Sequence, residues 1–306
     1  MSVEAGPSVD DEQERPHRGA LGTTWAALGL LRERRWAGAL AGVVVLTIVF
    51  LFLGRWQLHR HEAKSARNHL IAANYDATPV PLAQILPAGA TLADEQEWRQ
   101  VTVTGEYLAD DTVLIRNRPH DQIGQAGTVG TGGNSQNGYE VVVPLRGADG
   151  TVLFVDRGWI PAGSSDASRP DSVPAPPTGQ VTVVARLRPS EPASDRTAPA
   201  GQAARLNVAA LTGQTGLDAA DVVGAFGALV SEDPPAADTP EAAEEPDTGL
   251  GINLSYSVQW DSFAIIAYVL FGVAMVREVR RRDEEDEDED DGSAGAEPVI
   301  TRATYR

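Results

Sequence analysis

The chain has no cysteine, which excludes a disulfide framework and any metal site built from thiolates. Lysine is nearly absent too, because Lys64 is the only lysine among the 25 lysines and arginines. The 43 acidic residues outnumber them, which gives a formal net charge of −18. Binding to nucleic acid phosphates requires a basic surface, which so acidic a chain does not favour. We therefore expect no nucleic acid partner. The many arginines, alanines, glycines and prolines indicate a GC-rich bacterial genome.

Catalytic signatures are also missing. No G-x-S-x-G or H-E-x-x-H motif occurs, and no pair of clustered carboxylates stands out. The glycine-rich stretch 124–138 lacks the Lys-Ser/Thr pair of a phosphate-binding loop. On a helix, His59 and His61 point to nearly opposite sides, so they do not form the i, i+4 pair of a metal site. We expect no catalytic residue and no metal ligand, and hence a protein that is not an enzyme.

Two long apolar segments are present. Residues 36–58 form a helix of roughly 33 Å, which is long enough to cross the core of a bilayer. Residues 254–276 form a second apolar segment that contains one charged side chain, Asp261. Buried core helices are the alternative, but those are usually shorter and amphipathic. A cleavable signal peptide is disfavoured because no A-x-A site ends the first segment. The sequence predicts two transmembrane helices.

Between the two segments the apolar pattern changes to a period of two, which is typical of half-buried strands. Short turns such as Ala148-Asp149-Gly150 separate successive strands. The predicted strands lie at 98–108, 112–118, 139–147, 151–161 and 179–188. The fold class is therefore a membrane protein with two transmembrane helices flanking a mainly antiparallel β domain, a barrel or a sandwich. The acidic, proline-rich stretch 231–248 is predicted to be a flexible loop of that domain.

The arginines predict the topology. They cluster before the first apolar segment and after the second, so we expect both termini in the cytoplasm and the β domain outside it. Basic residues also follow the first segment, so this segment alone does not fix the orientation. The stretch before the second segment is acidic, and this decides that the β domain lies outside the cytoplasm. The expected order is a disordered cytoplasmic tail (1–35), the first transmembrane helix (36–58), the extracytoplasmic β-rich domain (59–253), the second transmembrane helix (254–276) and an acidic cytoplasmic tail (277–306).

Four motifs in order resemble those of one family. Residues 53–60, LGRWQLHR, resemble its opening G-x-W-Q-L-x-R, and residues 101–107 resemble its V-x-V-x-G-x-Y/F strand. Residues 155–161, VDRGWIP, are close to V-N-R-G-W-V-P, and residues 256–260, YSVQW, resemble Y-A-x-x-W-F. With these motifs between two spanning helices, the chain resembles the surfeit locus protein 1 family, in the form of an actinobacterial-like bacterial member. The resemblance covers residues from about 50 to 275.

The resemblance implies a membrane-anchored, non-catalytic assembly factor for an aa3-type cytochrome c oxidase in the cell membrane. Such a factor assists haem a insertion into the catalytic subunit or stabilises that subunit. The implied partners are the catalytic subunit, haem a synthase and membrane lipid. Two alternatives stay open, namely a permanent accessory subunit of the oxidase and a chaperone that itself binds haem a.

The resemblance also bears on haem a contacts. Some bacterial members are thought to bind haem a through a histidine three residues before the tyrosine that corresponds to Tyr256. That position is Asn253 here, and an amide is a poor axial ligand of haem iron. We expect His59 as the candidate ligand, with Arg55 or Arg60 holding a propionate. The alternative is that His59 contacts lipid headgroups.

Partner contacts are predicted at two places. The tryptophan-glutamine pairs at the end of the first helix and at the start of the second lie at the same depth, where an aromatic belt is the alternative. The strand that ends in Arg-Gly-Trp could contact the oxidase or haem, or could simply stabilise the fold. The residues predicted to bind a partner are Trp56, Gln57, Arg157, Trp159, Tyr256, Gln259 and Trp260.

Overall fold

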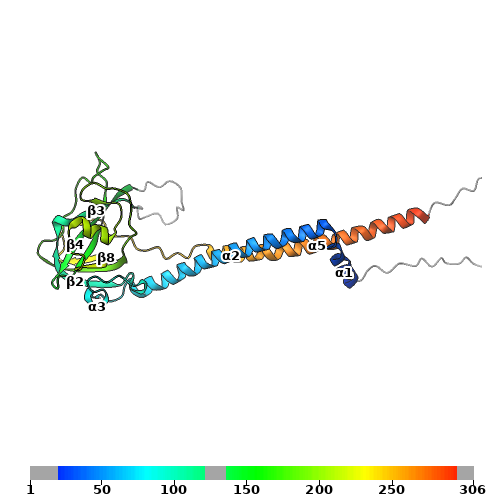
Figure 1. Cartoon of the computed structure of the whole chain (residues 1–306), viewed down its shortest axis with the longest axis horizontal. Helices are drawn as coiled ribbons and strands as arrows, with labels where there is room; N and C mark the ends of the chain where they lie inside the picture. The colour runs from blue at the N-terminus through cyan, green and yellow to red at the C-terminus, as the bar shows by residue number, and fades with distance from the viewer. Residues whose placement is uncertain (1–19, 121–135, 295–306) are drawn as a thin grey trace, which may run out of the picture. The chain divides into compact units, whose positions relative to one another are not determined.

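The computed structural model describes residues 20–120 and 136–294, which fall into two compact units (Figure 1). The first unit contains the chain up to Ala63 and from Leu250 onward, and the second contains Lys64–Gly249. The boundaries of the β-rich domain predicted from the sequence, 58/59 and 253/254, mark the ends of the expected spans and stay predictions. The predicted loop at 124–138 lies largely outside the described residues, and 136–138 already belong to a strand.

Helices form the first unit, namely α1 (Ala20–Leu30), most of α2 (Arg34–Asn74) and α5 (Asn253–Ala294). Both α2 and α5 contain an apolar window long enough to cross a membrane, and only 6% and 17% of these windows is buried. A core helix of a soluble protein would bury most of such a surface, so the exposed apolar windows fit two membrane-spanning helices. Residues 20–30 are helical, although the sequence analysis expects a disordered tail over 1–35.

A glycine allows α2 and α5 to approach closely. A Cβ atom on Gly54 would lie 2.9 Å from Oδ1 of Asp261 and 3.4 Å from the carbonyl oxygen of Ser257. Small residues at such a crossing let two backbones come together, and van der Waals packing then holds the helices. The glycine of the sequence LGRW therefore marks where the two predicted spans pack.

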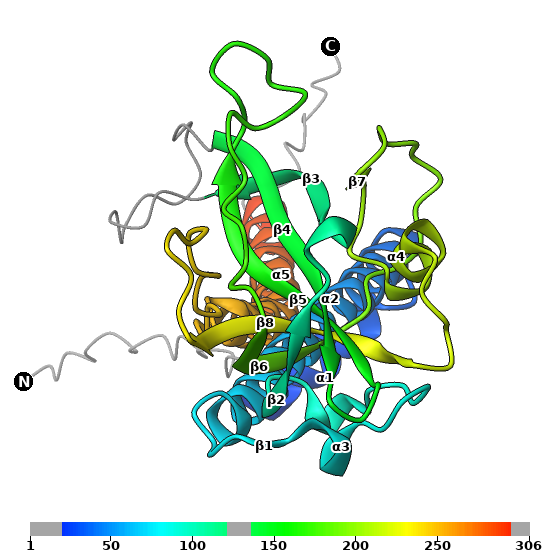
Figure 2. The same ribbon diagram turned by 90° about the vertical axis from the view of Figure 1, so that its left-hand side faces the viewer.

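The second unit is built around a closed barrel of five strands (Figure 2). Around the barrel the order is β2-β6-β8-β5-β4, and β4 pairs with β2 again. All neighbouring pairs are antiparallel except β5 and β8, which run parallel. The strands are β2 (Gln100–Tyr107), β4 (Gln136–Gly147), β5 (Val152–Pro161), β6 (Gln180–Pro189) and β8 (Val222–Asp233). This Greek-key barrel has the architecture of the OB-fold, so the choice between barrel and sandwich is settled and the predicted fold class is confirmed.

The barrel closes at Gly105, the glycine of the V-x-V-x-G-x-Y stretch. Gly105 lies opposite Gly147 in the register of β2 and β4. A Cβ atom on Gly105 would lie 2.0 Å from the carbonyl oxygen of Arg146, so a side chain there would push the two strands apart. The motif glycine is thus explained by the contact that converts the sheet into a barrel.

Shorter elements surround the barrel. On the outer side, β3 (Val113–His120) pairs with β4, and the two-residue β7 (Gln202–Ala203) pairs with β3. Helix α4 (Val208–Thr215) begins at Asn207, whose side chain accepts a hydrogen bond from the Ala210 N–H, and ends at Gly216 with a φ of 72°. The remaining elements are β1 (Val80–Pro81), α3 (Leu82–Ile85), η1 (Asp94–Gln96) and η2 (Ala109–Asp111).

Two apolar cores lie on opposite faces of the same strands. Leu153 and Val155 of β5 belong to the barrel interior, while Val152 and Phe154 pack on the outer face beneath β3 and α4. Because both faces of β5 are covered, its sequence is a nearly continuous apolar run rather than an alternating one. The end of this strand carries the motif DRGWIP, which is where the candidate site begins.

The acidic segment after the barrel is partly ordered. Strand β8 runs to Asp233, and Glu241 forms an isolated antiparallel bridge with Trp159. The carbonyl oxygens of Asp247 and Thr248 accept hydrogen bonds from Arg67 and Asn68 of α2. The loop predicted at 231–248 thus begins within β8, and its flexibility stays a prediction.

Candidate functional site

Arg157 lies inside the barrel. Its side chain continues the inward row of Leu153 and Val155 and has 0% exposure. Nη2 donates a hydrogen bond to Oε1 of Glu232 at 2.9 Å, and Nη1 donates to the carbonyl oxygen of Pro174 at 3.0 Å. The Glu232 side chain is itself only 4% exposed. A buried ion pair therefore joins β5 to β8.

Tyr107 of β2 completes this buried group. Its hydroxyl donates to Oε2 of Glu232 at 3.1 Å, and the Arg157 guanidinium lies 5.7 Å from the centre of its ring. Burial, followed by the negative charge of Glu232, raises the pKa of Tyr107 well above its ordinary value. Tyr107 thus stays a neutral donor, and three strands of the barrel are connected through one carboxylate.

Gly158 allows the acidic segment to reach the barrel. Its φ is +127°, and a Cβ atom there would lie 2.2 Å from the carbonyl oxygen of Glu241. The Trp159 N–H donates to that oxygen at 2.7 Å, and the Glu241 N–H donates to the Trp159 carbonyl at 2.8 Å. Only glycine combines this backbone conformation with so close an approach.

Trp159 stays partly exposed beside this bridge. Its Nε1–H donates to the carbonyl oxygen of Arg118 at 2.9 Å, which fixes the ring against β3. A hollow of about 240 Å³ lies next to it and is lined in part by Asp171, Asp238 and Pro240. The Arg-Gly-Trp motif therefore has a packing role at each position, and its tryptophan also borders a surface recess. The predicted contacts of Arg157 and Trp159 with a partner stay predictions.

A second charged cluster lies on the outer face of β4 and β5. Arg118 contacts Oε2 of Glu140 at 2.8 Å and Oε1 of Glu191 at 2.7 Å. Asp156 is buried, and its Oδ1 accepts the Gly158 N–H at 3.1 Å. Burial is the largest cause that raises the pKa of both Glu140 and Asp156 above the usual carboxyl range. The sequence analysis does not single out this cluster; carboxylates inside apolar strands are the only signal for it.

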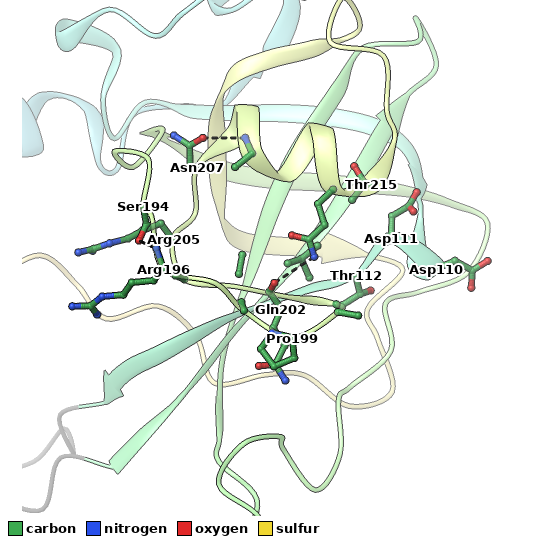
Figure 3. Close-up of a pocket in the computed structure, with 18 residues that line it drawn as sticks. Asp110, Asp111, Thr112, Ser194, Arg196, Pro199, Gln202, Arg205, Asn207 and Thr215 are labelled. Atoms are coloured by element: carbon green, nitrogen blue, oxygen red, sulfur yellow. Dashed lines mark hydrogen bonds between the residues drawn. The ribbon is translucent and has the colours of Figure 1, made fainter.

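A cavity of about 560 Å³ opens between the β2–β3 connection and residues 194–215 (Figure 3). Figure 3 shows Asp110 and Asp111 on one side and Arg196 and Arg205 on the other. In OB-fold barrels, ligands bind near the equivalent loops. The lining mixes polar side chains with alanine, valine and proline, and it offers no aromatic ring on which a ligand could stack. None of the predicted site residues lines this cavity.

The other predicted partner-binding residues lie on α2 and α5. The Trp56 ring is 46% exposed, with the Arg60 guanidinium 5.1 Å from its centre. Trp260 instead packs between the helices, where its ring lies 5.6 Å from Phe50. Oε1 of Gln57 is buried and has no hydrogen-bond partner among the described residues. Tyr256 is 39% exposed and Gln259 is also exposed.

His59 and Asn253 show how far the chain fits haem a. The His59 side chain is exposed, and neither His59 nor Arg60 lines the cavity of about 560 Å³ or the hollow of about 240 Å³ next to Trp159. The Asn253 amide donates to the Leu250 carbonyl at 3.2 Å. A haem needs an enclosing apolar pocket as well as an axial ligand. The haem a contacts of His59 and Arg60 stay predictions.

Two apolar helices that bracket a closed five-stranded barrel define a two-span membrane protein with a β-rich domain between its spans. The family model described as "SURF1 family" matches residues 44–265, from the first span through the barrel into the second. The chain belongs to the SURF1 (surfeit locus protein 1) family, whose members are known generally as cytochrome oxidase assembly factors. The resemblance predicted from four motifs is thus confirmed.

Individual relatives agree with this assignment. The chain is 31% identical over 258 residues to uncharacterized SURF1-like proteins of Mycobacterium tuberculosis and Mycobacterium bovis, which covers 84% of this chain and 89% of each relative. A SURF1-like protein of Rickettsia bellii is 24% identical over 117 residues, or 38% of this chain and 41% of the relative. One of Dictyostelium discoideum is 26% identical over 120 residues, or 38% and 40%.

Proposed function

We propose that this protein is a non-catalytic assembly factor for an aa3-type cytochrome c oxidase, and that it assists haem a insertion into the catalytic subunit or stabilises that subunit. The observation that carries the proposal is the family match, which begins within the first span, covers the whole barrel and ends within the second span. Among the described residues, no group of three or more His, Cys, Asp or Glu side chains could hold a metal ion. In this proposal haem a is cargo that passes to the oxidase.

The proposed partners are the oxidase catalytic subunit, haem a synthase and membrane lipid. The proposed location is the cell membrane, with both termini in the cytoplasm and the barrel on the other side. The arginines that precede the first apolar segment and follow the second support this orientation. A helix pair with exposed apolar faces is suited to lateral contact with another membrane subunit, because helices in a bilayer associate through van der Waals packing.

Specific residues have distinct parts in this proposal. Trp56 and Tyr256 are exposed on the two helices and contact the catalytic subunit, together with Gln57 and Gln259. Trp159 contacts a partner from the barrel, while the buried Arg157 holds the strand that carries it. Trp260 positions α5 against Phe50 of α2. His59 and Arg60 are the residues from which transient haem a contacts are proposed.

The test is a deletion strain that is complemented with variants of the full-length chain. Deletion lowers the amount of assembled oxidase and its haem a content, and the wild-type chain restores both. Trp56→Ala restores less oxidase than wild type, whereas Val45→Ala, also exposed on α2, serves as the matched control and restores it fully. Unchanged oxidase and haem a content after deletion would refute the proposal.

The same strains separate the two alternatives. A permanent accessory subunit co-purifies with the mature oxidase in equal amounts, whereas an assembly factor co-purifies with the incomplete enzyme. A chaperone that binds haem a shows a haem absorbance after co-expression with haem a synthesis, and His59→Ala removes that absorbance. His69→Ala, another exposed histidine of α2, is the control for the loss of a histidine in general.

A further inference from the structure

One side of the short helix α1 packs on α5. Ala27 and Leu30 of α1 are 6% and 5% exposed and form an apolar cluster with Met275 and Val279 of α5. All four residues belong to the helical unit. The buried side of α1 is therefore fixed to the end of a membrane-spanning helix.

The opposite side of α1 is apolar but uncovered. Trp25 is 74% exposed and Leu28 is 50% exposed, and the two residues lie three apart on one face. The helix sequence, ALGTTWAALGL, contains no charged residue. A helix whose outer face met water would carry polar or charged side chains there. This face therefore calls for an apolar or interfacial environment.

The contacts of α1 place it where the apolar run of α5 ends. Met275 lies within that run, while Val279 lies about 6 Å further along the helix and beyond Arg277. On α2 the apolar run begins at Trp36, whose ring lies 6.0 Å from that of Phe271. Both spans thus change from apolar to charged at the level of α1, which is the depth of a membrane surface.

The connection from α1 to α2 is fastened at the same level. Both carboxylate oxygens of Glu33 accept hydrogen bonds from Arg282 of α5, at 2.7 and 2.9 Å. Figure 1 shows α1 turned away from the line of the α2–α5 pair. Its 11 residues reach about 16 Å, which is too short for a bilayer core of roughly 30 Å. Hence α1 cannot be a third span.

We propose that α1 lies in the plane of the membrane surface, with Trp25 and Leu28 inserted among phospholipids at the boundary between headgroups and acyl chains. The exposed apolar surfaces of α2 and α5 continue to this point, so the same lipid covers both. Tryptophan favours that boundary because its ring is apolar and its N–H is polar. Apolar side chains of in-plane helices reach roughly 5–10 Å into it.

The absence of native cysteine makes a direct depth measurement possible. Single cysteines at Gly29 and Leu28 are spin-labelled in the full-length chain, which is reconstituted into vesicles of phosphatidylcholine and phosphatidylglycerol. Gly29 is suitable because a Cβ atom there meets nothing within 4 Å and because Trp25 is kept. Val45→Cys, on the exposed face of the first span, and Asp195→Cys, exposed on the barrel unit, calibrate lipid and water.

The readout is the ratio of label accessibility to oxygen, which concentrates in lipid, over accessibility to a water-soluble nickel chelate. We expect the ratios at Gly29 and Leu28 to exceed the Asp195 ratio several-fold and to stay below the Val45 ratio. Adding Trp25→Ser to Gly29→Cys should lower its ratio toward the value for water, whereas Thr23→Ser should not.

Three results would overturn the proposal. Ratios equal to that of Asp195 would show that α1 lies in water. Low accessibility to both reagents would show that protein, either a second copy or a soluble partner, covers this face instead of lipid. A Val45 ratio typical of water would show that the first span does not lie in a bilayer, and α1 could then not lie at its surface. Since none of these readouts involves oxidase activity, the result is independent of the function proposed above.

Discussion

Replacing Arg157 by methionine tests whether the Arg-Gly-Trp motif acts first through the barrel. Methionine can occupy much of the arginine's space but removes both donated hydrogen bonds, to Glu232 and to Pro174. Glu232, with its side chain 4% exposed, then keeps only the Tyr107 hydroxyl as a partner. Breaking a buried ion pair from one side typically costs about 3–5 kcal/mol, because the remaining charge is buried without compensation. That is a large part of the roughly 5–15 kcal/mol by which a domain is stable.

The double variant Arg157→Met with Glu232→Leu provides the control. It removes both charges, and the buried Tyr107 hydroxyl is then left without its acceptor, which costs roughly 1–3 kcal/mol. We therefore expect the double variant to be about 2 kcal/mol more stable than the single one. The assay is urea unfolding of the full-length protein in detergent, followed by the tryptophan fluorescence of the barrel.

The outcome also separates folding from partner binding. If Arg157 acts only through the fold, the double variant recovers both barrel stability and oxidase assembly in the complemented deletion strain. If the arginine itself contacts a partner, stability returns but oxidase does not. A single variant as stable as wild type, or a double variant as unstable as the single one, would refute the buried-pair argument.

Three further predictions follow from other contacts. Gly158→Ala places a Cβ atom 2.2 Å from the Glu241 carbonyl oxygen, so we expect the bridge between Glu241 and Trp159 to open and the free energy of unfolding to fall by about 3–5 kcal/mol. Proteolysis between residues 234 and 249 should then be faster than in the wild type. Unchanged cleavage would contradict this. Because burial raises the pKa of Glu140 to about 8 in the folded state, the folded chain binds more protons than the unfolded one, and the contribution of Glu140 to stability should fall as the pH rises from about 4 to about 8. In thermal unfolding, Glu140→Gln should make this fall shallower. An equally steep fall in the variant would argue against the raised pKa. Gly54→Leu should separate α2 from α5 and lower oxidase assembly while barrel stability stays at the wild-type value, whereas Gly42→Leu, where a Cβ atom meets nothing within 4 Å, should have no effect on either.

Several features of the fold could be predicted because they depend on local pattern. A bilayer sets the length of an apolar helix, and the pleat of a strand sets a period of two, so both can be counted along the sequence. The motif LGRWQLHR and the strand motif VDRGWIP identified the family on the same basis. The helix at 20–30 was not predicted because its eleven residues, although uncharged, are too few and too weakly patterned to be told apart from the polar tail that precedes them.

The roles of the charged residues could not be predicted. Arg157 follows Asp156 at the end of a strand, where two charges usually indicate a solvent-exposed surface. In the structure Arg157 enters the barrel because Glu232, 75 residues later, meets it there from β8. Asp156 lies on the outer face of the barrel, near Arg118 and Glu140. It is buried there, which the strand pattern does not predict.

Sequence alone determined the two spans, the β-rich nature of the domain between them and the family, because each depends on residues near one another along the chain. The tertiary structure decided which strands are neighbours, that the sheet closes at Gly105, and that Arg157 is an interior residue. Burial of a charge is tolerated only when a partner of opposite charge is present. That partner arrives through long-range strand pairing, which local periodicity does not specify.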